Sequence, residues 1–303
     1  MDIFYQGVNI TEDVQIESCI VNDTAGKRCD SLTIEFENAS SWYSWGPAED
    51  DQIQVAHNGY DSGIMYVNRI SPEGETYKIL ATTLPCKARE KGYQSFIDKT
   101  VEEIMRQCAM NSSMEYRLYG IDGNAVIPYI ERSNEGNAGF LARMLKLEGA
   151  QLKCINGAYA AIGLEYAQSR EPVETMELTA SQEGMTHCDD GQRKSGIMIQ
   201  TPYAKAYLTD TSEPVGRLLL PGSEIAPLND IQAARWGKHY LMDHNRKKEA
   251  ITVQSEFNPA LTAMQRIDIE GAYAGEWLIQ NVEHDLISLK STVTMHRCIW
   301  SVQ

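Results

Sequence analysis

The stretch Ile127–Gly157, IPYIERSNEGNAGFLARMLKLEGAQLKCING, decides how the rest of the chain is interpreted, because it places a short helix between two strand-like segments. Phe140 and Met144 are four residues apart, as are Leu141 and Leu145, so these apolar side chains fall on one stripe of a helix. Such a stripe must be buried against another element. The stretch therefore predicts a strand, an amphipathic helix and a second strand.

Both ends of this helix carry local signals. Ser133 is a suitable N-cap because its hydroxyl can accept a hydrogen bond from an unpaired amide of the first turn, and Glu135 places negative charge where the helix dipole favours it. The helix is predicted to run to Glu148, with Gly149 in the left-handed position that follows a helix end. Arg143 and Glu148 lie off the apolar stripe, on faces expected to remain in contact with water.

The same stretch resembles the arginine-serine, F-L-x-R-L and E-G block of the phage late control protein D family. Proteins of that family are hubs of contractile phage tails, and the block also occurs in the hub half of type VI secretion spike proteins. The matching residues, expected to be structural, are Arg132, Ser133, Phe140, Leu141, Arg143, Leu145, Glu148 and Gly149.

Composition indicates a folded, soluble protein. The 303 residues suffice for two or three small domains, and 43% hydrophobic with 23% charged residues is ordinary for a globular chain. No run approaches the ~18 apolar residues of a membrane helix, and the start lacks the pattern of a signal peptide. We expect no membrane insertion by this chain and assembly in a cytosol.

The charged and sulfur-containing residues exclude further classes of function. The seven cysteines are widely spread with no C-x-x-C pair, so reduced structural thiols are expected and a disulfide framework or zinc knuckle is not indicated. A net charge of −15 argues against specific nucleic-acid binding. Solubility explains the charge most simply, although an acidic surface also suits a channel past which DNA slides.

The first part of the chain, from Val8 to Leu84, is typical of a small barrel or sandwich, because short alternating strands are separated by turn signals. The order SLTIEF, Trp42, DDQIQVA and GIMYVNRI also resembles the first barrel of the hub family. Trp42, Tyr43 and Trp45 fit a glycan-binding platform, but a loop folded over a barrel end is the favoured interpretation.

Residues 95–168 are predicted to form one α/β unit after a polar linker at 86–94. Ser95 followed by Asp98 matches a capping box, and apolar residues recur at helical spacing as far as Met110. This segment resembles the S-F-x-x-x-T-V-x-x-I helix that opens the family's middle domain.

The last part is less regular before it becomes strand-rich. Residues 196–200 and 204–208 are predicted strands, residues 186–196 a polar surface loop, and Asn229 with Gln232 caps a helix over 229–245. The four strands that follow resemble the family's closing pattern, although Ala263-Met264-Gln265 stands where the family often has Pro-Gly. The matching residues are Ala233, Ala234, Arg235, Asn258, Pro259, Leu261, Gly271, Trp277, Ile279, Val282 and His284.

The sequence contains possible metal ligands but no established catalytic or metal-binding motif. The run His187-Cys188-Asp189-Asp190 and the helical group His239, Asp243 and His244 contain ligand types, but adjacent residues seldom face one centre and no fourth ligand is identifiable for the helical group. His284, in a strand, is expected to be hydrogen-bonded rather than catalytic. No metal, cofactor or catalytic residue is assigned, and the chain is not expected to be an enzyme. Two carboxylates suffice for glycoside hydrolysis, so a peptidoglycan hydrolase stays an alternative.

The resemblance implies a mainly β fold with an α/β insertion: two small tail-tube-like β-barrels flank the α/β unit. The expected domains are 1–86, 87–168 and 169–303, with helix 229–245 in the last. It further implies a homotrimer that forms a pseudo-sixfold ring in a tail baseplate. Its expected partners are a spike protein, a tail tube or tube-initiator protein, a tape measure protein and baseplate wedge proteins. A hydrolase and a glycan-binding tail module are the alternatives.

Overall fold

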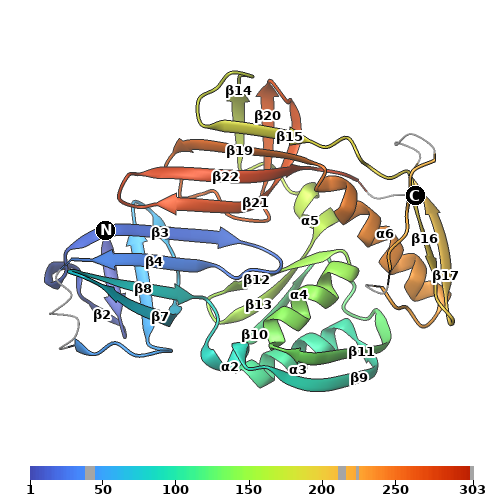
Figure 1. Ribbon diagram of the computed structural model, residues 1–303, viewed down its shortest axis with the longest axis horizontal. Coiled ribbons are helices and arrows are strands. Elements are labelled where there is room, and N and C mark those ends of the chain that lie inside the picture. The colour runs from blue at the N-terminus through green and yellow to red at the C-terminus, as the bar shows by residue number, and fades with distance from the viewer. Residues whose placement is uncertain (38–44, 211–215, 223–224, 301–303) are drawn as a thin grey trace.

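The computed structural model describes residues 1–37, 45–210, 216–222 and 225–300 (Figure 1). One 14-stranded sheet draws strands from both ends of the chain, and three smaller sheets accompany the helices. No helix in the described part has both the length and the apolar character needed to span a lipid bilayer. The predicted mainly β architecture with an α/β insertion is confirmed.

The N-terminal part supplies half of the large sheet. Its strands alternate as predicted, so that Leu32, Ile34 and Phe36 are completely buried on one side of the sheet. The elements are β1 (Asp2–Tyr5), β2 (Val8–Asn9), the 3₁₀ helix η1 (Thr11–Asp13), β3 (Ile16–Thr24), β4 (Ser31–Phe36), β5 (Gln52–His57), β6 (Tyr60–Asp61), β7 (Met65–Glu73) and β8 (Thr76–Thr82).

The C-terminal part supplies the other half of this sheet. Its strands are β14 (Glu174–Leu178), β15 (Met185–Asp189), β19 (Glu249–Glu256), β20 (Arg266–Gly271), β21 (Gly275–Asp285) and β22 (Lys290–Arg297). The hydrogen-bonded order is β15-β19-β22-β21-β3-β4-β8-β7-β5-β1-β2, while β14 pairs with β20, β20 with β21, and β6 with β5. The 186–196 segment is therefore not wholly a loop, since its first residues belong to β15, which pairs with β19.

Strands β3 and β21 meet in antiparallel fashion and form a seam between the two halves, with Thr24 opposite Asn281. Outward from the seam, β3 is followed by β4 and β8, and β21 by β22 and β19, all antiparallel. Both seam strands are long and have a register shift against their outer neighbour. On each side of the seam two further strands thus follow in antiparallel order, although β21 also pairs with β20 and β3 has no matching partner among the described strands.

Two closed barrels are not seen. Within residues that the structure describes, strand pairing runs through the seam as one curled sheet whose path ends at β15 and β2. The physical reason is that the β3–β21 pairing uses strand edges that would otherwise be available to close each half on itself.

The middle part packs helices against two small sheets. Strand β13 pairs with β10 and β12, and β9 pairs with β11. The elements are α2 (Cys86–Arg89), β9 (Gly92–Thr100), α3 (Val101–Ser112), β10 (Glu115–Tyr119), β11 (Val126–Glu135), α4 (Asn137–Leu147), β12 (Ala150–Ile155), β13 (Ala158–Gly163) and α5 (Leu164–Ser169).

The helix predicted to begin at Ser95 begins later, and residues 92–100 are a strand instead. Thr100 is the N-cap of α3, and it forms a reciprocal capping box with Glu103. Residues 95–98 and 100–103 both fit the local capping pattern, but pairing with β11 holds Ser95 in an extended conformation opposite Glu131. Tertiary pairing therefore selected the later cap.

The start of α4 was also predicted wrongly, whereas its end is confirmed. Strand β11 continues through Ser133 to Glu135, and Gly136 is the N-cap residue. Gly149 has a left-handed φ of +74° directly after the helix, as predicted. The apolar stripe of α4 is completely buried, and it consists of Phe140, Leu141, Met144 and Leu145.

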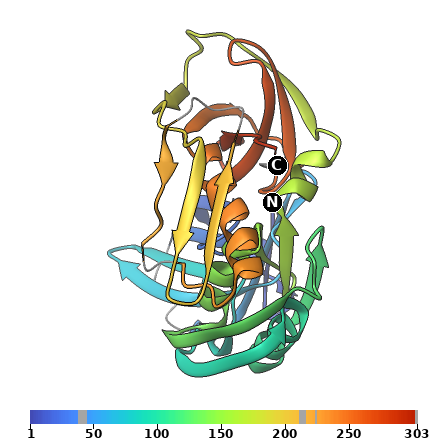
Figure 2. The same ribbon diagram turned by 90° about the vertical axis from the view of Figure 1, so that its right-hand side faces the viewer.

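The remaining helix, α6 (Asp230–Arg246), has the predicted cap, because the Asn229 side chain accepts from the amide of Gln232. It packs against one face of a three-stranded sheet of β16 (Gly196–Gln200), β17 (Lys205–Thr209) and β18 (Leu218–Leu219), and it lies behind this sheet in Figure 2. Ile197 and Trp236 from this region join the same core as α3 and α4. The middle core therefore includes residues beyond 168, while the three domain boundaries stay a prediction.

Candidate functional site

A buried charged junction ties together three segments that are far apart in the sequence. Lys153 of β12 places its Nζ 2.7 Å from Asp23 Oδ1 and 3.1 Å from Asp30 Oδ2. Asp23 also accepts a 2.7 Å hydrogen bond from the amide of Ala263, and Asp30 accepts one from the amide of Thr24. The N-terminal half-sheet, the middle part and the turn after β19 therefore meet at this junction.

The charges in the junction do not balance, since two carboxylates share one ammonium. Burial raises the pKa of Asp30 to about 7, Lys153 opposes this rise, and Asp23 adds to it. Burial alone would lower the pKa of Lys153, but Asp30 and Asp23 outweigh it and raise that pKa. The junction can consequently take up a proton near neutral pH.

His284 lies at the seam and is hydrogen-bonded on both ring nitrogens. Nε2 is 3.1 Å from the carbonyl of Leu261, which can only accept, so Nε2 carries the proton. Nδ1 then accepts from the Ser291 hydroxyl at 2.9 Å, and Ser291 in turn accepts from the amide of Asn258. Burial lowers the pKa of His284 and favours this neutral form. The network joins the N-P-x-L and histidine segments of the closing pattern.

The turn that departs from the family pattern has a strained backbone. Met264 has a left-handed φ of +71°, and its amide bonds to the carbonyl of Ile279 at 2.9 Å. Glycine occupies such a conformation more easily than a residue with a side chain. Met264 is nevertheless buried, so packing holds the turn.

Glu148 is buried, contrary to the prediction that it remains in contact with water. Its carboxylate accepts hydrogen bonds from Arg235 at 2.8 and 3.0 Å and from Trp236 Nε1 at 2.7 Å. Both donors belong to α6, which packs on α4. The sequence around Glu148 does not predict this packing. Two segments of the family resemblance, Glu148-Gly149 and Ala233–Arg235, therefore meet in space.

The helical group of possible metal ligands does not converge. The His239 ring packs over Gly149, where a Cβ would lie 2.6 Å from the ring, and its Nδ1 is 3.2 Å from the carbonyl of Leu147. Asp243 instead pairs with Lys247 at 2.6 Å and with Arg246 at 3.1 Å. His239 and Asp243 are thus engaged within the chain, whereas Nε2 of His244 is buried without a hydrogen-bond partner, and the three side chains share no metal-binding centre among the described residues.

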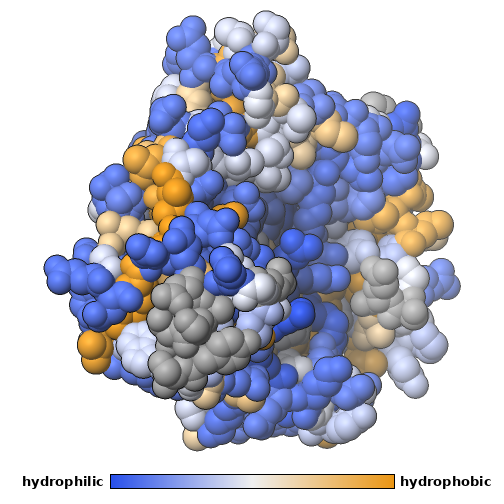
Figure 3. All heavy atoms as spheres, turned by 60° about the vertical axis from the view of Figure 1, so that its left-hand side comes forward, coloured by the Kyte–Doolittle hydropathy of each residue, from blue (hydrophilic) through white to orange (hydrophobic). Residues whose placement is uncertain are grey.

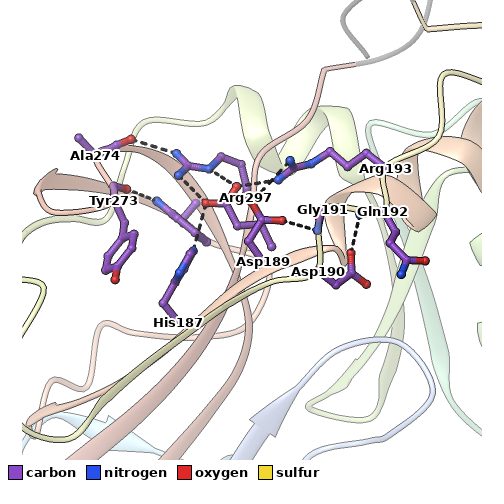
Figure 4. Close-up of polar contacts among 11 residues, drawn as sticks. His187, Asp189, Asp190, Gly191, Gln192, Arg193, Tyr273, Ala274 and Arg297 are labelled. Carbon is purple, nitrogen blue, oxygen red and sulfur yellow. Dashed lines mark hydrogen bonds and ion pairs between the residues drawn. The ribbon is translucent and has the colours of Figure 1, made fainter. Parts of the chain in front are cut away.

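A second charged cluster surrounds Glu249 at the outer part of the C-terminal half-sheet (Figure 4). Arg297 donates two hydrogen bonds to the Glu249 carboxylate, at 2.8 and 2.7 Å, and Arg193 donates one at 2.8 Å. Arg297 also lies 4.3 Å from the ring centre of Trp277 and donates to the carbonyl of Ala274. Burial alone would raise the pKa of Glu249, but Arg297 outweighs it and lowers that pKa.

The run His187-Cys188-Asp189-Asp190 spreads over this cluster without converging on a centre. His187 stacks on Tyr273 at 4.1 Å and lies 3.4 Å from Glu249, whereas Cys188 is exposed. Asp190 bonds to the amide of Gln192 and to Lys248, so it shapes the loop (Figure 4). The described residues contain no group of three or more His, Cys, Asp or Glu arranged to hold a metal ion.

The other predicted structural residues hold neighbouring elements together. Phe140 stacks on Phe96 of β9 at 5.3 Å. Arg143 donates to the carbonyl of Glu131, and Arg132 bonds to the side chain of Asn137. Leu141 and Leu145 are buried core residues, Trp277 is buried and donates to the carbonyl of Tyr273, and Ser133 is exposed on β11.

The aromatic cluster predicted near residue 42 is only partly described. Trp42 and Tyr43 lie outside the described residues. Trp45 is half exposed and stacks on Tyr5 at 5.2 Å. One ring of the suggested glycan platform is therefore packed against the protein itself.

Sequence reasoning missed the Lys153 junction and the Glu249 cluster. Lys153 and Asp23 are 130 residues apart, so no local pattern connects them. Glu249 is the first residue of β19, and the next residue, Ala250, pairs with His296 of β22. Only this register places Arg297 beside Glu249. The sequence contains only one hint of the Glu249 cluster, which is that β19 begins and β22 ends with a charged residue.

Much of the face shown in Figure 3 is hydrophilic, and it is hollowed near its centre. Exposed side chains lie in facing pairs on two of the three small sheets. Tyr129 lies opposite Ile97 on the β9–β11 pair, and Tyr207 lies opposite Met198 on the β16–β17 pair. All four are exposed, and such groups commonly mark contact surfaces.

The whole chain matches solved structures at low sequence identity. A tail protein from Neisseria meningitidis aligns over 98% of this chain and 95% of its own, with a TM-score of 0.72 and 12% identity. The 43 kDa tail protein of prophage MuSo2 from Shewanella oneidensis covers 98% and 96%, with a TM-score of 0.68 and 13% identity. The fold is that of phage tail proteins.

The likeness extends to a component of the Escherichia coli type VI secretion system, described as similar to the phage T4 tail proteins gp27 and gp5. It covers 97% of this chain and 76% of its own, with a TM-score of 0.58 and 10% identity. No family model and no curated protein matches the sequence. The resemblance to tail and secretion proteins is thus confirmed at the level of the fold.

Proposed function

We propose that this protein is the structural hub of a contractile tail or related injection particle. Three copies form a pseudo-sixfold ring that joins a hexameric tail tube to a trimeric spike and forms part of the central channel. The observation that supports this most directly is the tail-protein fold, shared over 98% of the chain. The role is one of assembly, and it requires no cofactor and no bond chemistry.

The symmetry of the large sheet supports the ring. Three chains satisfy sixfold contacts only if each presents two similar units, and each side of the seam continues through two further antiparallel strands. Open edges such as β15 and β2 would then pair with adjacent copies and complete barrel-like units, because unpaired edges favour aggregation. Closed point symmetry keeps the number of such contacts finite.

The proposed domains are 1–86, 87–168 and 169–303, with the exposed apolar side chains of the small sheets as contact surfaces. The proposed partners are the spike, the tail tube or its initiator, the tape measure and the baseplate wedge proteins. The proposed location is the tail baseplate, after assembly in the cytoplasm of the bacterial host.

The negative net charge suggests that the channel wall repels DNA that passes through it. Three copies at −15 each carry −45, and if much of this charge lines the channel, a passing phosphate chain is repelled from the wall. A channel wall of positive potential in the assembled ring would contradict this part of the proposal.

Imaging the intact particle at side-chain resolution tests the hub directly. We expect three copies on the tube axis, with the two half-sheets alternating around the ring. Six copies, or copies placed away from the axis, would refute the proposal. Release of soluble fragments from peptidoglycan by the purified protein would instead favour the hydrolase.

A further inference from the structure

A polar cavity of about 630 Å³ lies over the seam between the two half-sheets. Its floor is one face of the β3–β21 pair, where Asn22 is opposite Glu283 and Thr24 is opposite Asn281. The two asparagine side chains present amide groups, which can both donate and accept hydrogen bonds. All three parts of the chain contribute to the cavity.

The walls and rim are rich in positive charge. Lys146 comes from α4, Lys247 from the C-cap of α6, and Lys27 and Arg28 from the tip of the β3–β4 hairpin. These four cations face only two carboxylates in the lining, although the chain as a whole carries −15. The cavity is therefore a local concentration of positive charge on an acidic protein.

The cations of the hairpin tip have no carboxylate partner among the described residues, whereas those of the wall share one. The carboxylate of Asp243 is already shared, since Lys247 lies 2.6 Å from it and Lys146 3.6 Å. Lys27 and Arg28 are exposed and have no ion-pair partner among the residues described. A ligand carboxylate would find a free ammonium and a free guanidinium at the entrance.

Two buried nitrogen atoms without hydrogen-bond partners lie at or beside the cavity. Arg246 is 1% exposed and bonds to Asp243 and Gln280, two lining residues, yet its Nη1 has no acceptor in the described structure. Nδ1 of His296, a lining residue, is also buried without a partner. Burial lowers the pKa of His296 to about 4, so the ring is neutral, and because it already bonds to the backbone of Glu249, Nδ1 is an acceptor. An unpaired buried polar atom is costly, so an occupant that offers an N–H group to His296 is favoured.

We infer that this cavity binds an acidic peptide segment of a partner protein. Arg28 can pair with a carboxylate through two parallel hydrogen bonds, and lysines at the rim and wall supply further charge. Asn22, Asn281 and Glu283 also offer acceptor oxygens, which suit the N–H groups of a peptide backbone, whereas a phosphate diester supplies acceptors only. The site belongs to one copy, so the inference does not depend on the proposed ring.

The test is a titration of the full-length protein with a fluorescein-labelled oligoglutamate peptide, followed by fluorescence anisotropy at low ionic strength. An oligoglutamine peptide of equal length, a short oligothymidylate and inorganic phosphate serve as comparison ligands. We expect saturable binding of oligoglutamate that weakens with added salt.

The decisive variant reverses both charges of the hairpin tip, Lys27→Glu with Arg28→Glu. We expect it to weaken oligoglutamate binding by at least about tenfold, since two attractive contacts become repulsive. Arg69→Glu with Lys205→Glu is the matched control, because it changes the net charge equally at exposed residues outside the cavity and should retain binding. Lys27→Gln with Arg28→Gln replaces the reversal if that variant melts at a lower temperature than the parent.

The inference is overturned if the parent does not bind oligoglutamate, or if tip and control variants lose binding equally. Tighter binding of oligothymidylate, or displacement by inorganic phosphate at concentrations where chloride has no effect, would likewise reject it in favour of a phosphate ligand. None of these results bears on the symmetry of the particle, so failure here is distinguishable from failure of the hub.

Discussion

The Lys153 junction and the Glu249 cluster both join distant segments through charge, but they differ in exposure to water. All three charged side chains around Lys153 are 7% exposed, whereas the Arg193 and Arg297 side chains around Glu249 are 21% and 27% exposed. The first has an excess of negative charge, whereas in the second Glu249 and Asp189 balance Arg193 and Arg297. Surplus charge is costly in the interior, so the first cluster carries a cost that the second avoids.

This difference indicates that the two clusters do different work. Removing one member of a buried ion pair leaves an unsolvated charge, while exposed pairs contribute little. We therefore expect the Lys153 junction to hold the parts of the chain in place. The Glu249 cluster should mainly order the loop that follows β15.

The largest expected effect comes from Lys153→Met, which keeps the length of the side chain but leaves Asp23 and Asp30 without their cation. We expect the free energy of unfolding to fall by about 3–5 kcal/mol, measured by urea denaturation followed by circular dichroism. The control is Lys99→Met, which removes an exposed lysine paired with Glu103 and should cost about 0.5 kcal/mol or less. Equal losses in the two variants would abolish the contrast drawn above.

The next effect is a pH dependence carried by Asp30. Its pKa is raised from 3.8 to about 7 in the folded protein, so between these values the folded state retains a proton that the unfolded state releases. Asp30 therefore stabilises the fold fully below pH 3.8, and this stabilisation is lost as the pH rises towards 7. At 1.36 kcal/mol per pKa unit, the change is up to about 4 kcal/mol across this range.

Unfolding curves for the parent and Asp30→Asn at several pH values isolate this contribution from all other carboxylates. The stability of the parent relative to the variant should decrease as the pH rises. A constant difference would mean that Asp30 is ionised throughout and that the surplus negative charge resides elsewhere.

Glu148 provides an intermediate case, because its carboxylate is buried while its partner Arg235 is partly exposed. Glu148→Gln keeps the shape and the Trp236 hydrogen bond but removes the charge facing Arg235. We expect a loss of about 1–3 kcal/mol by urea denaturation. Glu12→Gln, at an exposed acidic residue of η1, should change stability little, and a loss there as large as at Glu148 would show that the measurement reports only net charge.

These regions also show what the sequence can predict. The apolar stripe of α4, the left-handed Gly149 and the Asn229 cap depend on neighbours within a few residues, and all three are confirmed. The start of α3 was misplaced because two adjacent segments fit the same capping pattern, and pairing of β9 with β11 chose between them. Local sequence patterns predicted that a helix forms here, but they could not decide which of the two capping patterns begins it.

The charged junctions could not be predicted from local patterns, because their partners lie far apart in the sequence. Glu148 is polar and lies off the apolar stripe, so its helix alone predicts exposure; its burial follows from α6, almost ninety residues later. Closed barrels were expected from the family resemblance and, for the first part of the chain, from its alternating strands, yet the seam depends on β3 meeting β21. Contacts of high sequence separation decide these features, and no short pattern records them.

The smallest effect is expected from Glu249→Gln. This variant tests the exposed cluster, as Lys153→Met tests the buried junction. The variant removes the charge that Arg297 and Arg193 share, but water screens both arginines, so we expect a loss of about 1 kcal/mol at low salt and less at high salt. Urea denaturation at two ionic strengths measures both values, and limited proteolysis should show faster cleavage after Asp190 as the loop loses its anchor. A loss comparable to that of Lys153→Met, unchanged by salt, would place Glu249 among the buried charges and would show that partial exposure of its partners is not what separates the two clusters.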